Sequence, residues 1–129
     1  MIVAWRLTKA RHATIAFDGE GARLEGGRWN PRGISVVYLC DHPALAALEA
    51  LIHLKGAATK IEFVMYRVEI PIEAPVLEPA VVDLPAGWRN EPPSPGTMAV
   101  GEKWIREGKA TVLKVPSVLV PAAANLVLN

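Results

Sequence analysis

Residues 34–56 read ISVVYLCDHPALAALEALIHLKG, and the apolar pattern of this stretch changes character halfway along. Its first six residues are mostly large and apolar with two alternating faces, which predicts a β-strand. Pro43 suits the first turn of a helix that Asp41 or His42 can cap, and Gly56 suits its end. A strand that runs directly into a helix is therefore the starting point of the predicted fold.

The helix predicted after this strand carries apolar residues on most of its surface. At about 100° per residue, four of them share one arc, namely Leu45, Leu48, Leu51 and Ile52. Ala47 and Leu54 make the far side apolar too, so we expect the helix to be buried on most faces. Glu49 and His53, four residues apart, lie together at one edge of the arc.

Further elements are predicted on both sides of this pair. The patterns indicate strands at 2–7, 61–70, 112–115, 118–120 and 126–128, a helix at 97–107 and a weaker helical stretch at 8–17. Glycine and proline predict loops at 19–33 and 71–97. Because strands outnumber helices and one helix dominates, we expect a single α+β domain over residues 1–129, with a mixed or antiparallel sheet.

Length and composition limit the class of protein. A chain of 129 residues, with 51% hydrophobic and 21% charged residues, fits one globular domain. The net charge of +1 gives no general attraction to nucleic acid or to an anionic membrane, and no apolar run approaches the roughly 20 residues that span a bilayer. The lone Cys40 cannot form an internal disulfide, and the first residues do not resemble a signal peptide. We therefore expect a cytoplasmic protein that binds neither nucleic acid nor membrane directly.

Residues 26–31, GGRWNP, form the segment with the richest binding chemistry. Two glycines allow the backbone to pass close to a bound group, and Arg28 beside them can hold a phosphate through two parallel hydrogen bonds. The alternative is a glycine-rich turn with an arginine that faces solvent. Spacing alone leaves both interpretations open.

Glu49 is unusual because a carboxylate at the margin of an apolar helical arc is costly unless it has a partner or a task. One interpretation is a salt bridge at the helix edge, to Arg28 or Arg6. The other is a functional carboxylate. His53 by itself is more typical of a structural histidine.

Three further residues have both a structural and a functional interpretation. Arg6 lies inside an apolar strand, Tyr38 lies near the end of another, and Ser117 follows a proline at a strand break. A triad of Ser117, His53 and Glu49 lacks the glycine pattern of a nucleophile elbow. Histidines and acids show no metal-ligand spacing, so we expect no metal site.

Taken together and in order, these segments resemble the RES domain family, which is named for an arginine, a glutamate and a serine. The matching segments span essentially the whole chain: Trp5-Arg6, Gly21-Ala22, GGRWNP at 26–31, Val37-Tyr38, Ala47-Leu48-Glu49 with His53, Pro116-Ser117 and 125–129. The GGRWN element is specific, and the other segments gain weight from their order. RES domains usually continue after the final asparagine with Pro-x-His-Pro, whereas this sequence stops at Asn129, so we expect that tail to be missing here.

The resemblance implies a fold similar to that of ADP-ribosyltransferases and a bacterial toxin that consumes NAD⁺ as its substrate. It also implies an Xre-type helix-turn-helix antitoxin that forms a complex with the toxin and covers its active site. By motif, Glu49 would stabilise positive charge on the ribose, Arg28 and Arg6 would bind the pyrophosphate, and Tyr38 would stack on nicotinamide. Ser117 would bond the carboxamide or a phosphate.

The residues do not identify the acceptor of the ADP-ribose group. Cleavage of the nicotinamide–ribose bond with water or phosphate as acceptor, which depletes NAD⁺, is the reaction that we favour. Transfer of ADP-ribose to a protein target is the alternative. A non-catalytic interaction module with the same fold is a third interpretation, and it would not require Glu49.

Overall fold

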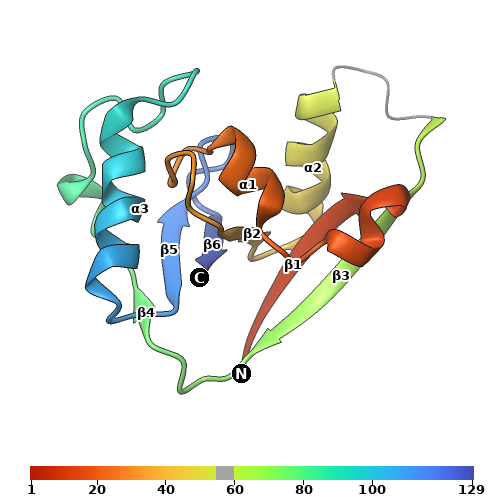
Figure 1. The fold of residues 1–129 in the computed structure, drawn as a ribbon, viewed down its shortest axis with the longest axis horizontal. Coiled ribbons are helices and arrows are strands. Elements are labelled where there is room, and N and C mark those ends of the chain that lie inside the picture. Colours follow the sequence, from red (N-terminus) through yellow and green to blue (C-terminus); the bar gives the residue numbers. More distant parts are fainter. Residues whose placement is uncertain (55–59) are drawn as a thin grey trace.

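The computed structural model describes residues 1–54 and 60–129, and it confirms the α+β class with a mixed sheet. In chain order, its elements are β1 (Ile2–Lys9), η1 (Ala10–Ile15), α1 (Glu20–Glu25), β2 (Val37–Cys40), α2 (Pro43–Leu54), β3 (Phe63–Ile70), β4 (Val76–Leu77), η3 (Val81–Asp83), α3 (Pro95–Glu107), β5 (Val112–Pro116) and β6 (Ala124–Leu128). Figure 1 shows α2 and α3 on opposite flanks, with α1 between them.

Six strands form one sheet in the order β3-β1-β2-β6-β5-β4. β4 pairs with β5 in parallel, and every other neighbouring pair is antiparallel, which makes the sheet mixed. β1 and β3 pair along their full length, from Ile2 opposite Ile70 to Lys9 opposite Phe63. In contrast, β1 and β2 are in register at one position only, Trp5 opposite Cys40. The sheet therefore splits next to this pair.

The two faces of the sheet hold separate groups of core residues. On one face, Trp29, Trp104, Leu113, Val115 and Val127 pack beneath α3 and the segment that contains Trp29. The other face contributes a second cluster made by Ala4, Leu39, Ile70, Val112 and Leu126. This division follows from the alternation along each strand, since neighbouring residues such as Val112 and Leu113 point to opposite faces.

α3 fixes the position of the loop before β2. Pro95 occupies the first turn of this helix, where its missing N–H has no cost, and Gly108 ends it with φ of 61°. Trp104 is 2% exposed, and its Nε1 donates a hydrogen bond to the carbonyl of Ala110 at 2.9 Å. A Cβ at Gly101 would lie 1.5 Å from the carbonyl oxygen of Trp29, so the glycine permits backbone contact between α3 and the loop.

Several predicted elements differ from those in the structure. The weak helix at 8–17 is a short 3-10 helix, η1, which follows a β1 that is two residues longer than expected. The loop predicted at 19–33 contains α1, whose residues are good helix formers between two glycines. No strand forms at 118–120, because that segment turns back on itself. The helix end expected at Gly56 lies outside the described residues.

The prediction that α2 is buried on most faces is wrong. Leu48, Leu51 and Ile52 are 39%, 51% and 50% exposed, whereas Leu45 and Ala46 are buried. Small alanines let the helix axis approach the sheet closely, so the contact face is centred on Ala46 rather than on the larger side chains. This rotation leaves a leucine–isoleucine stripe at the surface and turns Glu49 toward β2 and β6.

Candidate active site

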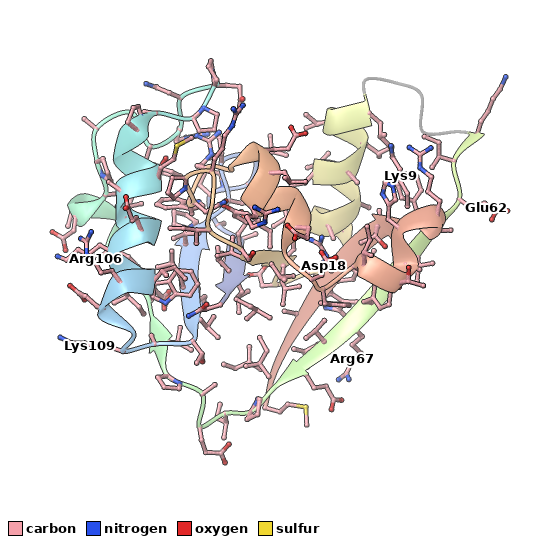
Figure 2. All side chains as sticks on the ribbon, viewed as in Figure 1. Lys9, Asp18, Glu62, Arg67, Arg106 and Lys109 are labelled. Atoms are coloured by element: carbon pink, nitrogen blue, oxygen red, sulfur yellow. The ribbon has the colours of Figure 1, made fainter. Side chains whose placement is uncertain are left out.

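A cavity of about 820 Å³ opens where β1 and β2 separate. Its lining comes from β1, the η1–α1 region, the loop before β2, β2 itself, α2 and β6. Four of the residues singled out from the sequence line it together, namely Arg6, Arg28, Tyr38 and Glu49. Figure 2 shows Arg106 on the outer side of α3 and Lys109 just beyond the end of that helix, whereas Asp18, which lines the cavity, lies between η1 and α1.

Glu49 extends from α2 toward the central strands and is partly buried. Its carboxylate accepts hydrogen bonds from Asn125 Nδ2, at 2.9 Å to Oε1 and 3.2 Å to Oε2, and from Cys40 Sγ at 3.2 Å. Among the described residues, no lysine or arginine lies within 4.0 Å of this carboxylate. Neither salt bridge that the sequence suggested, to Arg28 or to Arg6, is present.

Cys40 acts as a donor in this group. Burial, followed by the nearby Glu49 carboxylate, raises the pKa of the Cys40 thiol far above its ordinary range. The thiol is therefore protonated at neutral pH and is a poor nucleophile.

Tyr38 ties β2 to the glycine-rich loop. Its hydroxyl donates to Asn30 Oδ1 at 2.6 Å and accepts a hydrogen bond from the Trp29 backbone N–H at 3.1 Å. Burial raises the pKa of Tyr38 to about 12, so the phenol is neutral at physiological pH. A Cβ at Gly27 would lie 2.6 Å from the Tyr38 hydroxyl, which explains the glycine.

Asn30 is 1% exposed and completes the loop. Its Nδ2 donates to the backbone carbonyls of Ala22, Pro31 and Ile34, so one side chain joins α1 to both ends of the turn. The turn thereby becomes a rigid support for Arg28, because its polar groups are bonded within the protein.

Arg28 points across the cavity to residues 88–91. Its NH1 group donates to the carbonyls of Trp88 at 2.9 Å and Asn90 at 2.6 Å, and its NH2 group forms a 2.9 Å ion pair with Glu91. The Glu91 side chain is 78% exposed, so water can replace this partner readily. A guanidinium has five N–H donors. A phosphate that replaced Glu91 could therefore accept two parallel hydrogen bonds, one from NH2 and one from Nε.

Arg6 spans the split between β1 and β2. Its Nε donates to the carbonyl of Ala16 at 2.6 Å and its NH1 donates to that of Tyr38 at 3.0 Å. Burial lowers the pKa of the Arg6 guanidinium, and the negative charge of Asp18 opposes that shift. Arginine remains charged in proteins, so Arg6 adds a fixed positive charge to the cavity wall.

The structure does not bring Ser117 to the cavity with the other four residues. Its side chain is fully buried, and Oγ accepts the backbone N–H groups of Leu119 at 3.2 Å and Val120 at 3.3 Å. Ser117 thereby shapes the turn whose next two residues, Val118 and Leu119, do line the cavity. The His53 side chain lies outside the described part of the structure.

Sequence reasoning missed Asn125 and Glu91 as members of this site. In the sequence, Asn125 is marked only as part of the segment 125–129 that matches the family, and Glu91 lies in a proline-rich loop without periodicity. No local signal marks either residue, because each meets its partner only after distant segments pack together. For Cys40 the sequence excludes an internal disulfide, and it does not predict the contact with Glu49.

The cavity is lined by the two arginines, by the carboxylates of Asp18, Glu49 and Glu91, and by apolar walls that include Trp5, Ile52 and Leu119. Such a site can bind a phosphorylated ligand with an aromatic part and can stabilise positive charge next to a carboxylate. Within the described ranges, no group of three or more His, Cys, Asp or Glu side chains is arranged to hold a metal ion. The helices described in the structure include none that is long and apolar enough to cross a membrane.

Comparison with known proteins identifies the family of this chain. The RES domain family model matches residues 3–129. A Toxin Res of Yersinia enterocolitica is 36% identical over 129 residues, covering 99% of this chain and 84% of its own length. A Prs ADP-ribosylating toxin of Sphingobium is 36% identical over 131 residues, covering 97% and 80%.

A solved structure shares the fold. A chain of the M. tuberculosis MbcT–MbcA toxin–antitoxin complex superimposes with a TM-score of 0.78 over 98% of this chain and 72% of its own, at 23% sequence identity. The match of the family model to nearly every residue, with two relatives above 30% identity, settles the family. This chain is a member of the RES domain family.

Proposed function

We propose that this protein is the toxin of a toxin–antitoxin system and that it cleaves the nicotinamide–ribose bond of NAD⁺. The observation that carries the proposal is the Glu49 carboxylate, held by neutral donors at the wall of a cavity that two arginines also line. The names of the relatives support the toxin assignment, and the name of the Sphingobium relative fits chemistry on ADP-ribose.

The bond to be broken determines what the residues must do. Nicotinamide leaves with the bonding electron pair, and positive charge develops on the ribose as it becomes oxocarbenium-like. Glu49 stabilises that charge or holds the ribose hydroxyls, and no lysine or arginine among the described residues forms an ion pair with its carboxylate. Arg28 and Arg6 bind the pyrophosphate, with Glu91 giving way to a phosphate oxygen.

Tyr38 and Ser117 have supporting roles in this proposal. Because the Tyr38 hydroxyl is bonded to Trp29 and Asn30, its ring is held at the cavity wall, where nicotinamide can pack against it. Ser117 contributes through the turn at 118–120 that it caps.

The acceptor of the ADP-ribose group divides the proposal into two reactions. We favour water or phosphate, which would deplete cellular NAD⁺. Transfer to a protein is the second candidate, and the relative named as an ADP-ribosylating toxin supports it. Either reaction uses the same cavity and the same carboxylate, since both begin with departure of nicotinamide.

Mass spectrometry of the products separates these reactions. The purified protein is incubated with NAD⁺ alone, with added phosphate and with cell lysate. Free ADP-ribose indicates hydrolysis, ADP-ribose with one additional phosphate indicates phosphorolysis, and a mass increase on a lysate protein indicates transfer. Nicotinamide without any of these products, or no nicotinamide in all three mixtures, would contradict the proposal.

We further propose an Xre-type helix-turn-helix antitoxin as partner. The exposed stripe of Leu48, Leu51 and Ile52 lies on α2, and Ile52 also lines the cavity. A partner that covers this stripe would thus reach the cavity mouth, where a carboxylate of its C-terminal segment could replace Glu91 on Arg28. The structural neighbour comes from a toxin–antitoxin complex, which fits this arrangement.

A further inference from the structure

Among the described residues, Asn125 makes the shortest hydrogen bond to Glu49, and neither composition nor motif gave it a role. Its Nδ2 lies within 3.5 Å of four acceptors, and the two nearest are the carboxylate oxygens of Glu49, at 2.9 and 3.2 Å. The other two are the Leu39 carbonyl at 3.4 Å and the Cys40 sulfur at 3.5 Å. One amide group thus spans both oxygens of the carboxylate.

The backbone around Asn125 is fixed on both sides. β6 lies between β2 and β5, where Asn125 is opposite Cys40 on one side and Val115 on the other. A side chain on a strand paired at both edges has little freedom to follow a moving partner. Glu49 comes from a different element, α2, which packs against β1 and β2.

The kind of donor decides what this contact does. A lysine or arginine in the same place would orient the carboxylate but cancel much of its charge. An amide N–H and a thiol S–H orient it without adding a positive charge. Oε1 accepts bonds from both Asn125 and Cys40. From the side chains that the structure describes, Oε2 accepts the longer bond of Asn125 alone, which leaves it acceptor capacity for a ligand.

We propose that Asn125, assisted by Cys40, is a positioning residue that orients the Glu49 carboxylate for cleavage of the nicotinamide–ribose bond. This inference rests on the proposed function. Asn125 acts through Glu49 and does not bind the substrate, so its loss lowers kcat and leaves KM within a factor of about three.

The decisive variant is Asn125→Asp, which replaces the N–H donor with an oxygen at nearly constant shape. When protonated, the introduced carboxyl donates to Glu49 as the amide does. When ionised, it repels Glu49, because two carboxylates about 3 Å apart resist being charged together. We expect kcat for nicotinamide release to fall at least tenfold at pH 8.5 and to recover to within a few-fold of wild type at pH 5.5.

The control is Asn129→Asp, which adds the same charge at an exposed position outside the cavity. It should follow the wild-type pH profile throughout. Thermal melting at both pH values verifies that each variant is folded. A constant ratio of Asn125→Asp to wild-type kcat across pH, or an unchanged kcat, would overturn the positioning role.

A second pair of variants keeps the inference testable if Asn125→Asp does not fold. Cys40→Ala removes the thiol donor, and Cys40→Ser restores a donor of similar size. We expect Cys40→Ala to lower kcat several-fold and Cys40→Ser to keep most of the wild-type kcat. Equal kcat values for these two variants would contradict the role of Cys40 as a donor. Full activity of Glu49→Gln would defeat the proposed function itself, while an inactive Glu49→Gln with an unaffected Asn125→Asp would defeat only this inference.

Discussion

At the scale of single residues, the cavity contains charged groups whose present partners differ in how easily they can be replaced. Arg28 has two backbone carbonyls and the exposed carboxylate of Glu91 as its partners. The carbonyls belong to a folded loop and hold the guanidinium in place. The exposed ion pair contributes little stability, on the order of 0–1 kcal/mol, so a phosphate can displace the Glu91 carboxylate from Arg28.

Arg28→Lys tests whether the planar fork matters. Lysine keeps the charge but cannot bridge two backbone carbonyls and two phosphate oxygens at once. We expect the affinity for NAD⁺, measured by calorimetry with an inactive Glu49→Gln background, to fall about tenfold or more. Glu91→Gln is the matched control and should bind NAD⁺ as tightly as its parent or a few-fold more tightly. Unchanged affinity in Arg28→Lys would return Arg28 to a purely structural role.

Ionisation of Tyr38 is expected to lower the stability of the fold at alkaline pH. Its folded-state pKa of about 12 exceeds the ordinary value of 10.0, so the folded protein resists ionisation of this phenol more than the unfolded chain does. The resulting stability is complete below pH 10 and is lost as pH rises from 10 toward 12. Tyr38→Phe should be less stable than wild type at pH 8, because the Trp29 N–H and Asn30 Oδ1 lose their hydrogen-bond partner. Between pH 10 and 12, however, the free energy of unfolding of the variant should fall less than that of wild type, because the variant has no phenol to ionise at this position.

Urea denaturation at a series of pH values measures both effects of Tyr38→Phe. The second tyrosine, Tyr66, is present in wild type and variant and cancels in the comparison. Parallel pH dependences for the two proteins above pH 10 would show that burial of the Tyr38 hydroxyl does not govern this loss of stability.

At the scale of elements, the packing of α3 on the glycine-rich loop supports the whole site. A Cβ added at Gly101 would lie 1.5 Å from the carbonyl oxygen of Trp29, and this backbone atom cannot move aside as the end of a flexible side chain could. We expect Gly101→Ala to lower the free energy of unfolding by about 3 kcal/mol, even though alanine favours helix by about 1 kcal/mol over glycine.

Gly21→Ala is the matched control for Gly101→Ala. Gly21 lies in α1, and a Cβ there would meet no atom within 4 Å. Helix propensity alone then operates, and the variant should be as stable as wild type or up to about 1 kcal/mol more stable. Chemical denaturation of both variants gives the comparison, and similar stabilities would refute the close contact between α3 and the loop.

The elements with strong local patterns were predicted well from the sequence. β3, α3 and β5 were expected within about two residues of their observed bounds, because alternation and Pro71 mark the strands locally, and the helix predicted at 97–107 begins two residues earlier, at Pro95. α1 was missed because five glycines between Gly19 and Gly33 outweighed the helix formers in between. The strand expected at 118–120 is a turn instead, since Ser117 caps two of its backbone N–H groups.

The orientation of α2 illustrates what periodicity does not determine. Both the leucine arc and the alanine side were apolar, and the choice between them depended on how closely the helix could approach β1 and β2. That choice turned Glu49 toward Asn125, a residue 76 positions away along the chain. The sequence thus pointed to four residues that line the cavity, Arg6, Arg28, Tyr38 and Glu49, but it did not predict the partner of the carboxylate.

At the scale of the whole molecule, the cavity and the exposed stripe on α2 adjoin one another. A free toxin with both open should arrest growth, and a partner that covers both should prevent the arrest. We expect expression of this chain alone in a bacterial host to stop growth and to lower intracellular NAD⁺ if small molecules are the acceptor. Co-expression of the helix-turn-helix antitoxin that we propose as its partner should restore both. Normal growth with abundant folded protein would contradict the toxin proposal.

The central claim is that Glu49 drives departure of nicotinamide from NAD⁺, and one measurement tests it most directly. Purified wild-type protein and Glu49→Gln, matched for folding by thermal melting, are incubated with NAD⁺ and lysate, and free nicotinamide is quantified over time. The glutamine keeps the size of the side chain and removes its charge, so we predict release by wild type and a rate at least about a hundredfold lower for the variant. Equal rates of nicotinamide release from the two proteins would contradict the account.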